Sequence, residues 1–290
     1  MDTISIVGQG FVGNAVNQGM KHAYRIETYD KFCPEKSTVS HLGDLVEKTD
    51  FVFVCVPTPM RKDGSCDISI VEDVVGQLAD CYKNIKTDNK PVIVVKSTVP
   101  PGTSGYLNCK YQHVDVGFNP EFLREASPVD DFLNQTRIVL GGTPYSLEVM
   151  ERIYSKAYPE IPILKTDTAS AELVKYVTNC FLAMKVSFAN EIYQFCDKMK
   201  IDYDEVIDIV KRDERLGDSH WMVPGPMPDH NGDLKPGFSG SCFVKDINAL
   251  IHQMKSLDID PKVLLGAWNK NLEVRPERDW EHLIGRAVSE

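Results

Sequence analysis

The sequence lacks a long apolar run and an excess of positive charge. Hydrophobic residues make up 42% of the 290 positions, yet no stretch approaches the length that crosses a membrane. The net charge is −10, with acidic residues spread along the chain, which argues against nucleic acid or an anionic membrane as partner because both need a basic face. A strand pattern begins at Thr3 and leaves no room for a signal peptide, so we expect a cytoplasmic protein.

Metal-ligand spacing is also missing. The eight cysteines form no C-x-x-C pair and no ligand-spaced cluster with the seven histidines. Reduced thiols are therefore the default, and the sequence implies no metal. The cysteines lie at positions 33, 55, 66, 81, 109, 180, 196 and 242.

The first part of the chain alternates short β-branched runs with segments that can be helical. This alternation predicts an α/β fold over residues 1–167, a Rossmann domain with a mostly parallel sheet and helices on both faces. A further strand ends at Asp30. The other predicted strands are 3–7, 51–56, 91–95, 113–117 and 137–140.

The pattern changes at about Thr168. Some thirty residues follow without glycine or proline and with apolar positions at helical spacing, which predicts a long connecting helix that opens an all-helical domain over 168–290. Residues 215–240 are rich in glycine, proline and aspartate and are typical of a long loop. A helix resumes near Lys245, and another is interrupted near Arg275.

A glycine motif follows the first predicted strand. Residues 8–13 (GQGFVG) match G-x-G-x-x-G in the required context, between a strand and a helix. The glycines allow a tight turn, close approach of pyrophosphate and helix–strand packing, and the amides at the helix N-terminus face the phosphates. The alternative is a plain strand–turn–helix. The dinucleotide contacts we predict here are Gly8, Gly10, Phe11, Val12 and Gly13.

The acidic residue of the dinucleotide pattern is Asp30, at the end of the second strand. Its carboxylate is placed to accept hydrogen bonds from the adenine-ribose hydroxyls, and it would repel a 2′-phosphate. The sequence therefore favours NAD over NADP as cofactor, although Lys31 and Lys36 nearby weaken that preference.

A cysteine stands between a glycine loop and a helix start. In residues 237–246 (GFSGSCFVKD), Cys242 lies near the expected helix N-terminus and near Lys245, and both favour the thiolate that attacks a carbonyl carbon. The alternative for Cys242 is a small buried apolar residue, which is the interpretation we give the other seven cysteines.

The Cys242 loop resembles the GFGGSCFxKD segment of UDP-glucose dehydrogenases and the related GDP-mannose dehydrogenases. Other segments agree with this family in the same order. Residues 96–100 (KSTVP) are similar to its KSTVP turn, residues 117–125 (GFNPEFLRE) to its NPEFLREG segment, and residues 171–179 (AELVKYVTN) to its ELxKxxxN helix. We therefore identify the chain as a member of this family.

The resemblance implies a four-electron oxidation of a sugar C6 alcohol to a carboxylate by two NAD in succession. UDP-glucose is the expected substrate, and polysaccharide biosynthesis the implied setting. Cys242 would trap the aldehyde as a thiohemiacetal, which a second hydride transfer converts to a thioester for hydrolysis. Covalent capture of the aldehyde explains why an NAD-dependent dehydrogenase would need a nucleophilic cysteine.

The remaining catalytic roles fit side-chain chemistry. Lys175 and Asn179 lie four apart on one helix face, so both can reach one oxygen, the ammonium stabilising an oxyanion and the amide donating a hydrogen bond. Asp246 is expected to hold or activate water. By resemblance Glu121 is the better hydrolytic base, with Thr98 ordering the same water. The alternatives are a solvated helix residue for Lys175, a first-turn carboxylate favoured by the helix dipole for Asp246, and a surface charge for Glu121.

Binding residues are carried over from the family in the same way. Arg215 would reach the substrate of a neighbouring subunit, which implies a homodimer through the helical domain. The further cofactor contacts implied are Lys31, Val56, Pro57, Thr58, Ser97, Glu125 and Lys245. The substrate contacts implied are Phe122, Leu123, Arg215, Phe238, Ser239 and Gly240.

The sequence departs from the family in several places. Ser239 replaces a glycine, Val244 a proline or glutamine, and Ala126 follows the NPEFLRE segment. Family members usually continue into a second Rossmann-like domain, so we expect a short form. Two alternatives stay open: a β-hydroxyacid-type dehydrogenase, which transfers one hydride without a nucleophile, and a non-catalytic NAD-binding partner protein.

Overall fold

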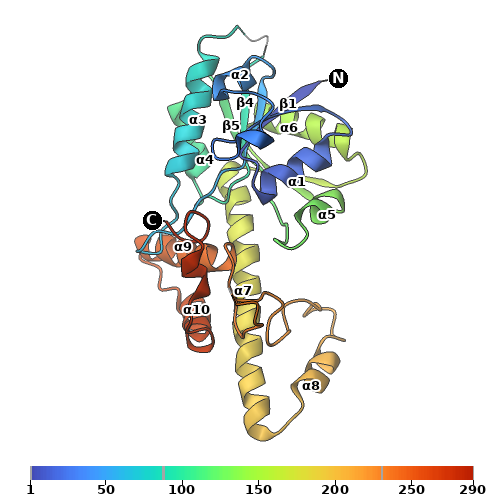
Figure 1. Ribbon diagram of the computed structural model, residues 1–290, viewed down its shortest axis with the longest axis vertical. Coiled ribbons are helices and arrows are strands. Elements are labelled where there is room, and N and C mark those ends of the chain that lie inside the picture. The colour runs from blue at the N-terminus through green and yellow to red at the C-terminus, as the bar shows by residue number, and fades with distance from the viewer. Residues whose placement is uncertain (1, 87–88, 230, 290) are drawn as a thin grey trace. The chain divides into compact units, whose positions relative to one another are not determined.

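A computed structural model describes residues 2–86, 89–229 and 231–289. The chain forms two compact units (Figure 1). The first unit contains the residues up to Thr58 and Ile68–Lys175, and the second contains Pro59–Asp67 and the residues from Tyr176 onwards.

The first unit is built on a seven-stranded sheet in the order β2-β1-β3-β4-β5-β6-β7. Neighbouring strands are parallel except for β5 and β6, which are antiparallel. This confirms the predicted α/β fold with its mostly parallel sheet. The strands are β1 (Thr3–Val7), β2 (Arg25–Tyr29), β3 (Phe51–Val54), β4 (Val92–Val95), β5 (Asp115–Phe118), β6 (Ile138–Gly141) and β7 (Ile163–Thr166).

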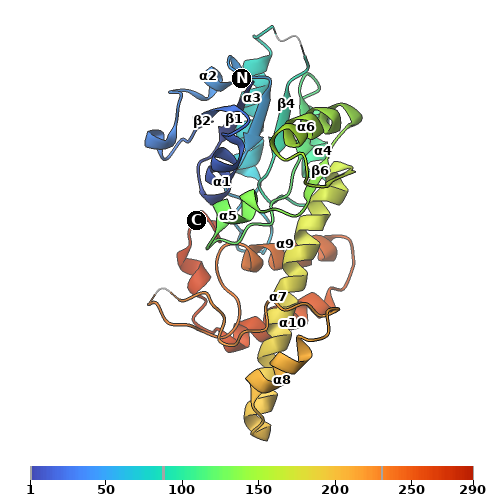
Figure 2. The ribbon, with the colours of Figure 1, turned by 90° about the vertical axis from the view of Figure 1, so that its right-hand side faces the viewer.

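Helices cover both faces of this sheet (Figures 1 and 2). Alternate residues of each strand point to opposite faces. Ile4 and Ile6 pack with α1, α5 and α6, whereas Val52 and Val54 pack with α2, α3 and α4. The helices of the unit are α1 (Phe11–Met20), α2 (Leu42–Val46), α3 (Ser69–Tyr82), α4 (Thr103–Lys110), α5 (Pro128–Leu133) and α6 (Pro144–Ala157), with a 3-10 helix at Pro34–Lys36.

The long helix predicted after Thr168 is present as α7 (Thr168–Met199). It is followed by α8 (Tyr203–Val210), α9 (Phe243–Ser256), α10 (Lys262–Val274) and a 3-10 helix at Asp279–His282. The described residues between 211 and 242 form no helix or extended strand, as the glycine and proline content predicted. None of the helices in the described part of the chain is long and apolar enough to cross a membrane.

Two apolar clusters hold the second unit together. One joins α7 to α9, α10 and the buried Trp280, and the other joins the last turns of α7 to α8 and Trp221. Figures 1 and 2 show α8 near the end of α7. The segment Pro59–Asp67 belongs to this unit because Met60 exchanges backbone hydrogen bonds with the end of the described chain. Its N–H donates to the Ala287 carbonyl at 2.9 Å, and its carbonyl accepts from Ser289 N–H at 2.8 Å.

Glu172 links the first turns of α7 to the N-terminus of α4. Its fully buried carboxylate accepts hydrogen bonds from the backbone N–H groups of Gly102 at 2.6 Å and Ser104 at 2.8 Å. These amides satisfy it, yet burial raises its pKa to about 7.

We predict a pH-dependent stability contribution from Glu172. Its folded-state pKa of about 7 exceeds the ordinary value of 4.5. Between these values the folded state keeps a proton that the unfolded state releases, so stability falls as pH rises, by up to roughly 3 kcal/mol, and stays reduced above pH 7. Urea unfolding of the wild type and Glu172→Gln from about pH 4.5 to about pH 8 should show the stability difference moving in favour of the variant. A difference that is constant over this range contradicts the assignment.

Candidate active site

The glycine turn between β1 and α1 has room for glycine alone at two positions. Gly8 has φ +88°, and a Cβ there would lie 2.5 Å from the Cys55 carbonyl oxygen. A Cβ on Gly13 would lie 1.8 Å from the carbonyl oxygen of Gly8. Gly10 differs, because a Cβ there would meet nothing within 4 Å among the described residues. The turn is therefore tight at its ends and open at Gly10, beside the N-terminus of α1.

Asp30 directly follows β2, and three backbone amides fix its carboxylate. It accepts from Gln9 N–H at 2.7 Å and from Phe32 and Cys33 N–H at 2.9 Å each. Burial alone would raise the pKa of Asp30. The three amide hydrogen bonds together lower it by more than burial raises it, so the net pKa is lowered. The group is an ionised acceptor, while Lys31 beside it is exposed. An open glycine turn, a helix N-terminus and a fixed carboxylate fit a dinucleotide.

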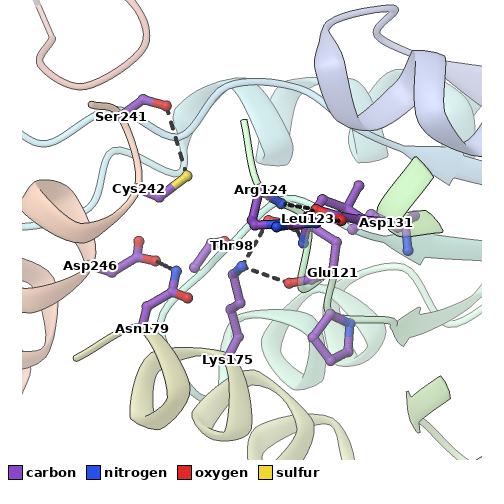
Figure 3. A network of polar contacts seen from close by, with 12 residues as sticks. Thr98, Glu121, Leu123, Arg124, Asp131, Lys175, Asn179, Ser241, Cys242 and Asp246 are labelled. Atoms are coloured by element: carbon purple, nitrogen blue, oxygen red, sulfur yellow. Dashed lines mark hydrogen bonds and ion pairs between the residues drawn. The ribbon is translucent and has the colours of Figure 1, made fainter. Parts of the chain in front are cut away.

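Lys175 of α7 and Glu121, which follows β5, form a buried ion pair. Lys175 Nζ lies 2.8 Å from Glu121 Oε1 and donates to the Glu121 carbonyl at 2.6 Å (Figure 3). Only 3% of Lys175 and 6% of Glu121 is exposed. Leu123 N–H donates to the other carboxylate oxygen at 2.7 Å. Lys175 is thus not a solvated helix residue and Glu121 is not a surface charge.

The charge state of Glu121 follows from these contacts. Burial would raise its pKa, but the Lys175 ammonium, the Leu123 amide and the nearby Lys96 lower it more, so the net pKa is lowered. Glu121 is therefore a carboxylate at neutral pH. Phe122, next in the chain, lies under the Arg137 guanidinium, whose carbon is 4.4 Å from the ring centre.

A second buried cation lies at the end of β4. Lys96 Nζ donates to Asn119 Oδ1 at 2.6 Å, and burial lowers the pKa of Lys96 to about 8. Asn119 Nδ2 in turn donates to the Val139 carbonyl at 2.7 Å. The sequence analysis did not single out Lys96 or Asn119 as site residues. The available signal was a lysine directly after an apolar strand, where a charge is buried only if it is paired.

Several predicted cofactor residues hold the turns after β3 and β4 together. The Ser97 hydroxyl donates to the Val56 carbonyl at 2.6 Å, and the Thr58 hydroxyl donates to the Thr98 carbonyl at 2.8 Å. Ser97, Thr58 and Thr98 are buried, whereas Pro57 between the two strands is exposed. The structure thus places these residues together at the carboxyl ends of two neighbouring parallel strands, where α/β sheets bind ligands.

In the second unit, Cys242 directly precedes α9 and is partly exposed. Its Sγ lies 3.9 Å from the Ser241 hydroxyl (Figure 3). Its position at a helix N-terminus is the one that the sequence predicted, and the helix dipole there favours a thiolate.

Asp246, one turn into α9, has a partner on each carboxylate oxygen. Asn179 Nδ2 of α7 donates to Oδ2 at 2.6 Å (Figure 3). Lys245 Nζ donates to Oδ1 at 2.5 Å. Burial would lower the pKa of Lys245, but the charges of Asp246, Cys66 and Cys242 raise it more. Lys245 therefore stays protonated, and its ammonium stabilises negative charge on the Cys242 sulfur.

The other predicted substrate residues are found in contrasting environments. Arg215 is exposed, and its Nε lies 2.9 Å from Oδ1 of Asp213, which is also at the surface. Phe238 is buried, while Ser239 and Gly240 are partly buried. Glu125 and Leu123 are partly buried in the first unit.

The fold and these residues define a two-part class of protein, in which a Rossmann dinucleotide-binding unit is followed by a helical unit. The chain belongs to the UDP-glucose/GDP-mannose dehydrogenase family. Residues 35–158 match the NAD binding domain of this family, and residues 169–273 match its central domain.

Named relatives agree with this membership. The UDP-glucose 6-dehydrogenase of Rickettsia typhi is 37% identical over 233 residues, which cover 78% of this chain and 50% of that protein. The chain spans about half the length of the curated relatives from Rickettsia and Bacillus that it matches.

Solved structures share the fold. A UDP-glucose dehydrogenase from Pyrobaculum islandicum superimposes with a TM-score of 0.82 and 28% identity, covering 94% of this chain and 68% of that one. A 3-hydroxyisobutyrate dehydrogenase from Mycobacterium tuberculosis has a TM-score of 0.74 at 16% identity, covering 96% of this chain and 95% of that one, and shows likeness of fold alone.

We predict that Lys175→Met destabilises the protein by about 3–5 kcal/mol, because it leaves the Glu121 carboxylate buried without its cation. The double variant Lys175→Met/Glu121→Gln should recover part of this loss, since both charges are then removed. Lys198→Met, an exposed lysine on the same helix, is the control and should change stability little. Urea unfolding measures all three, and equal stability of the Lys175 and Lys198 variants would refute the buried pair.

Proposed function

We propose that this chain is an NAD-dependent nucleotide-sugar 6-dehydrogenase that oxidises the C6 alcohol of UDP-glucose to the carboxylate. The observation that carries the proposal is the partly exposed Cys242, at the N-terminus of α9 behind a glycine loop and beside the protonated Lys245, in a chain of this family. A hydride-transferring enzyme needs no thiol for one oxidation. A thiol is useful when the aldehyde must be held for a second.

NAD fits the residues of the first unit and would accept one hydride in each oxidation. Gly8 and Gly13 keep the turn tight, and the open position at Gly10 admits a pyrophosphate against the amides at the N-terminus of α1. The Asp30 carboxylate offers about four lone-pair directions and uses three on backbone amides, so one is left for a ribose hydroxyl. Its negative charge disfavours the 2′-phosphate of NADP.

Cys242 supplies the covalent step. After the first oxidation its thiolate adds to the C6 aldehyde carbon, and the resulting oxyanion takes a proton to give a thiohemiacetal. Oxidation of the thiohemiacetal to a thioester removes the C6 hydride, which a second bound NAD would accept, and the hydroxyl proton. Water then displaces the thiol to give the carboxylate. The sum is one alcohol, one water and two NAD converted to one carboxylate and two NADH with release of protons.

The buried polar groups have matching roles in this scheme. Lys175 is a fixed ammonium that stabilises an alkoxide or oxyanion. Glu121 is ionised and so is in the form that accepts a proton from the hydrolytic water, with Thr98 ordering that water. Asp246 orients the Asn179 amide, which donates a hydrogen bond to the substrate oxygen.

A β-hydroxyacid-type dehydrogenase is the second candidate, because the 3-hydroxyisobutyrate dehydrogenase structure shares this fold over almost its whole length. Such an enzyme would transfer one hydride and release its product without a covalent intermediate. The fold does not separate the two candidates. The stoichiometry of NADH and the effect of removing the Cys242 thiol do.

We predict two NADH per sugar consumed when the purified protein receives UDP-glucose, and no such yield with GDP-mannose or UDP-N-acetylmannosamine. Cys242→Ser should abolish formation of the acid, because the hydroxyl is too weak a nucleophile to hold the aldehyde. Cys109→Ser, at an exposed cysteine, is the control and should keep full activity. A yield of one NADH per substrate molecule that is unchanged in the Cys242 variant would favour the β-hydroxyacid candidate, and NAD binding without turnover of any of the three sugars would favour a non-catalytic partner protein.

We also propose a homodimer through α7. Four large apolar side chains follow one face of this helix, Val177 at 54% exposure, Phe181 at 59%, Phe188 at 51% and Phe195 at 59%. Their spacing of four, seven and seven residues keeps them in one stripe, which is the pattern of a helix that packs along another helix. A second copy of the same stripe would cover it, and the exposed Arg215 would be available to the neighbouring subunit.

The dimer is tested by sedimentation equilibrium at several protein concentrations. We predict that the wild type sediments as two chains and that Phe181→Glu/Phe195→Glu sediments as one, because four buried carboxylates would face each other across the interface. Ile209→Glu, at an apolar residue of α8 that is 68% exposed, is the control and should leave the dimer intact. A monomeric wild type would overturn the proposal.

A further inference from the structure

A side chain of α10, Asn271, binds the main chain of the loop before Cys242. Asn271 is fully buried, and its side-chain amide forms two hydrogen bonds with the main chain of Phe238. Oδ1 accepts from Phe238 N–H at 2.7 Å, and Nδ2 donates to the Phe238 carbonyl at 3.0 Å. This is the paired exchange that a neighbouring β-strand would make, supplied here by one amide. It fixes both the position and the orientation of the peptide groups around Phe238.

Gly237 is shaped for this contact. It has φ +76°, and a Cβ there would lie 2.5 Å from Asn271 Oδ1. Its own N–H donates to Asn190 Oδ1 of α7 at 3.3 Å. The residue must therefore be glycine for two separate reasons, and amides from two helices bind two consecutive residues of the loop.

A buried ion pair supports the same loop from the side of α10. Arg275 is 1% exposed and binds Asp279 through two bonds, Nε to Oδ1 at 2.7 Å and Nη2 to Oδ2 at 2.8 Å. Arg275 Nη1 also donates to the Pro236 carbonyl at 3.3 Å. The Ser239 side chain hydrogen-bonds to Asp279 and helps to lower its pKa.

Ser239 is the position at which the loop departs from the family glycine. Its hydroxyl gives the loop a third attachment to the α10 side of the unit, beyond those at Phe238 and Pro236. The attachments thus cover positions 236 to 239, immediately before Gly240 at φ +77° and the cysteine. Without them, two glycines with positive φ would leave this stretch many conformations.

We infer that Asn271 is a positioning residue for Cys242, acting through the main chain of Phe238, with Arg275 and Asp279 as its support. The inference rests on the proposed role of Cys242 as the nucleophile. Attack on a carbonyl carbon requires the sulfur to be held within a narrow range of positions, and a loosened loop lowers the fraction of molecules that satisfy it. Asn271 itself touches no reacting atom.

The test uses the full chain and four variants. Asn271→Ala removes the paired contact, and Asn271→Asp keeps the shape and the acceptor but loses the donor to the Phe238 carbonyl. Arg275→Lys removes the two-bond pair with Asp279. Asn248→Ala is the matched control, because Asn248 is an asparagine of α9 whose amide bonds only the Val244 carbonyl of its own helix among the contacts of the described residues.

Two readouts separate positioning from general destabilisation. The first is the rate of alkylation of Cys242 by iodoacetamide as a function of pH, located by mass spectrometry. The second is the turnover number with UDP-glucose, compared with the dissociation constant for NAD. For Asn271→Ala we expect at least a tenfold lower turnover number and a changed alkylation profile at Cys242, with NAD binding within about twofold of the wild type. Asn271→Asp and Arg275→Lys should fall between it and the wild type.

The outcomes are decisive even if one variant fails to fold or the substrate assignment is wrong. If Asn271→Ala is unfolded, the Asp and Lys variants carry the comparison. If no sugar is oxidised, the alkylation profile still reports on Cys242, so failure of the proposed function is distinguished from failure of this inference. An alkylation profile that is the same in the Asn271, Arg275 and Asn248 variants as in the wild type overturns the inference.

Discussion

The pairing of charges that are out of contact with water is the constraint on which the rest of this structure depends. An isolated buried charge costs several kcal/mol, so Lys175 and Glu121 can be buried only together. Their contact ties the start of α7 to the loop after β5, and Glu172 ties the same helix to α4 through two backbone amides. The helix that carries Lys175 and Asn179 is thereby fixed by polar contacts as well as by apolar packing.

The same constraint shapes the second unit. Asp246 is buried with an amide on one oxygen and an ammonium on the other, so its contribution is to orient Asn179 and to keep Lys245 charged near the thiol. These contacts do not decide which carboxylate activates the hydrolytic water, because Glu121 also has an ammonium on one oxygen and an amide on the other. In the proposed scheme that role falls to Glu121, whose pKa is lowered by its ammonium neighbour.

Local signals in the sequence were sufficient for most of the fold. Alternating β-branched runs, a glycine turn and an uninterrupted helical period predicted the sheet, the turn at Gly8 and α7. The strand β7 was not predicted because its Ile-Leu-Lys-Thr sequence is half polar and lies at a sheet edge.

The contacts of Asn271 and Arg275 with the loop before Cys242 were not predicted, for a different reason. A polar residue on a helix has no periodic signature, and its partner in the loop lies more than thirty residues away. The roles of the predicted site residues stay predictions until the variants are measured.

The backbone bonds between Met60 and the segment around Ser289 bear on how the protein is made. These residues are 229 positions apart, yet they belong to the same unit. The ribosome synthesises the strands on both sides of Pro59–Asp67 long before it adds Ala287 and Ser289, the partners of Met60. Until then the backbone groups of Met60 form hydrogen bonds with water. The backbone bonds of Met60 can therefore form only after Ala287 and Ser289 have been synthesised, more than 200 residues further along the chain.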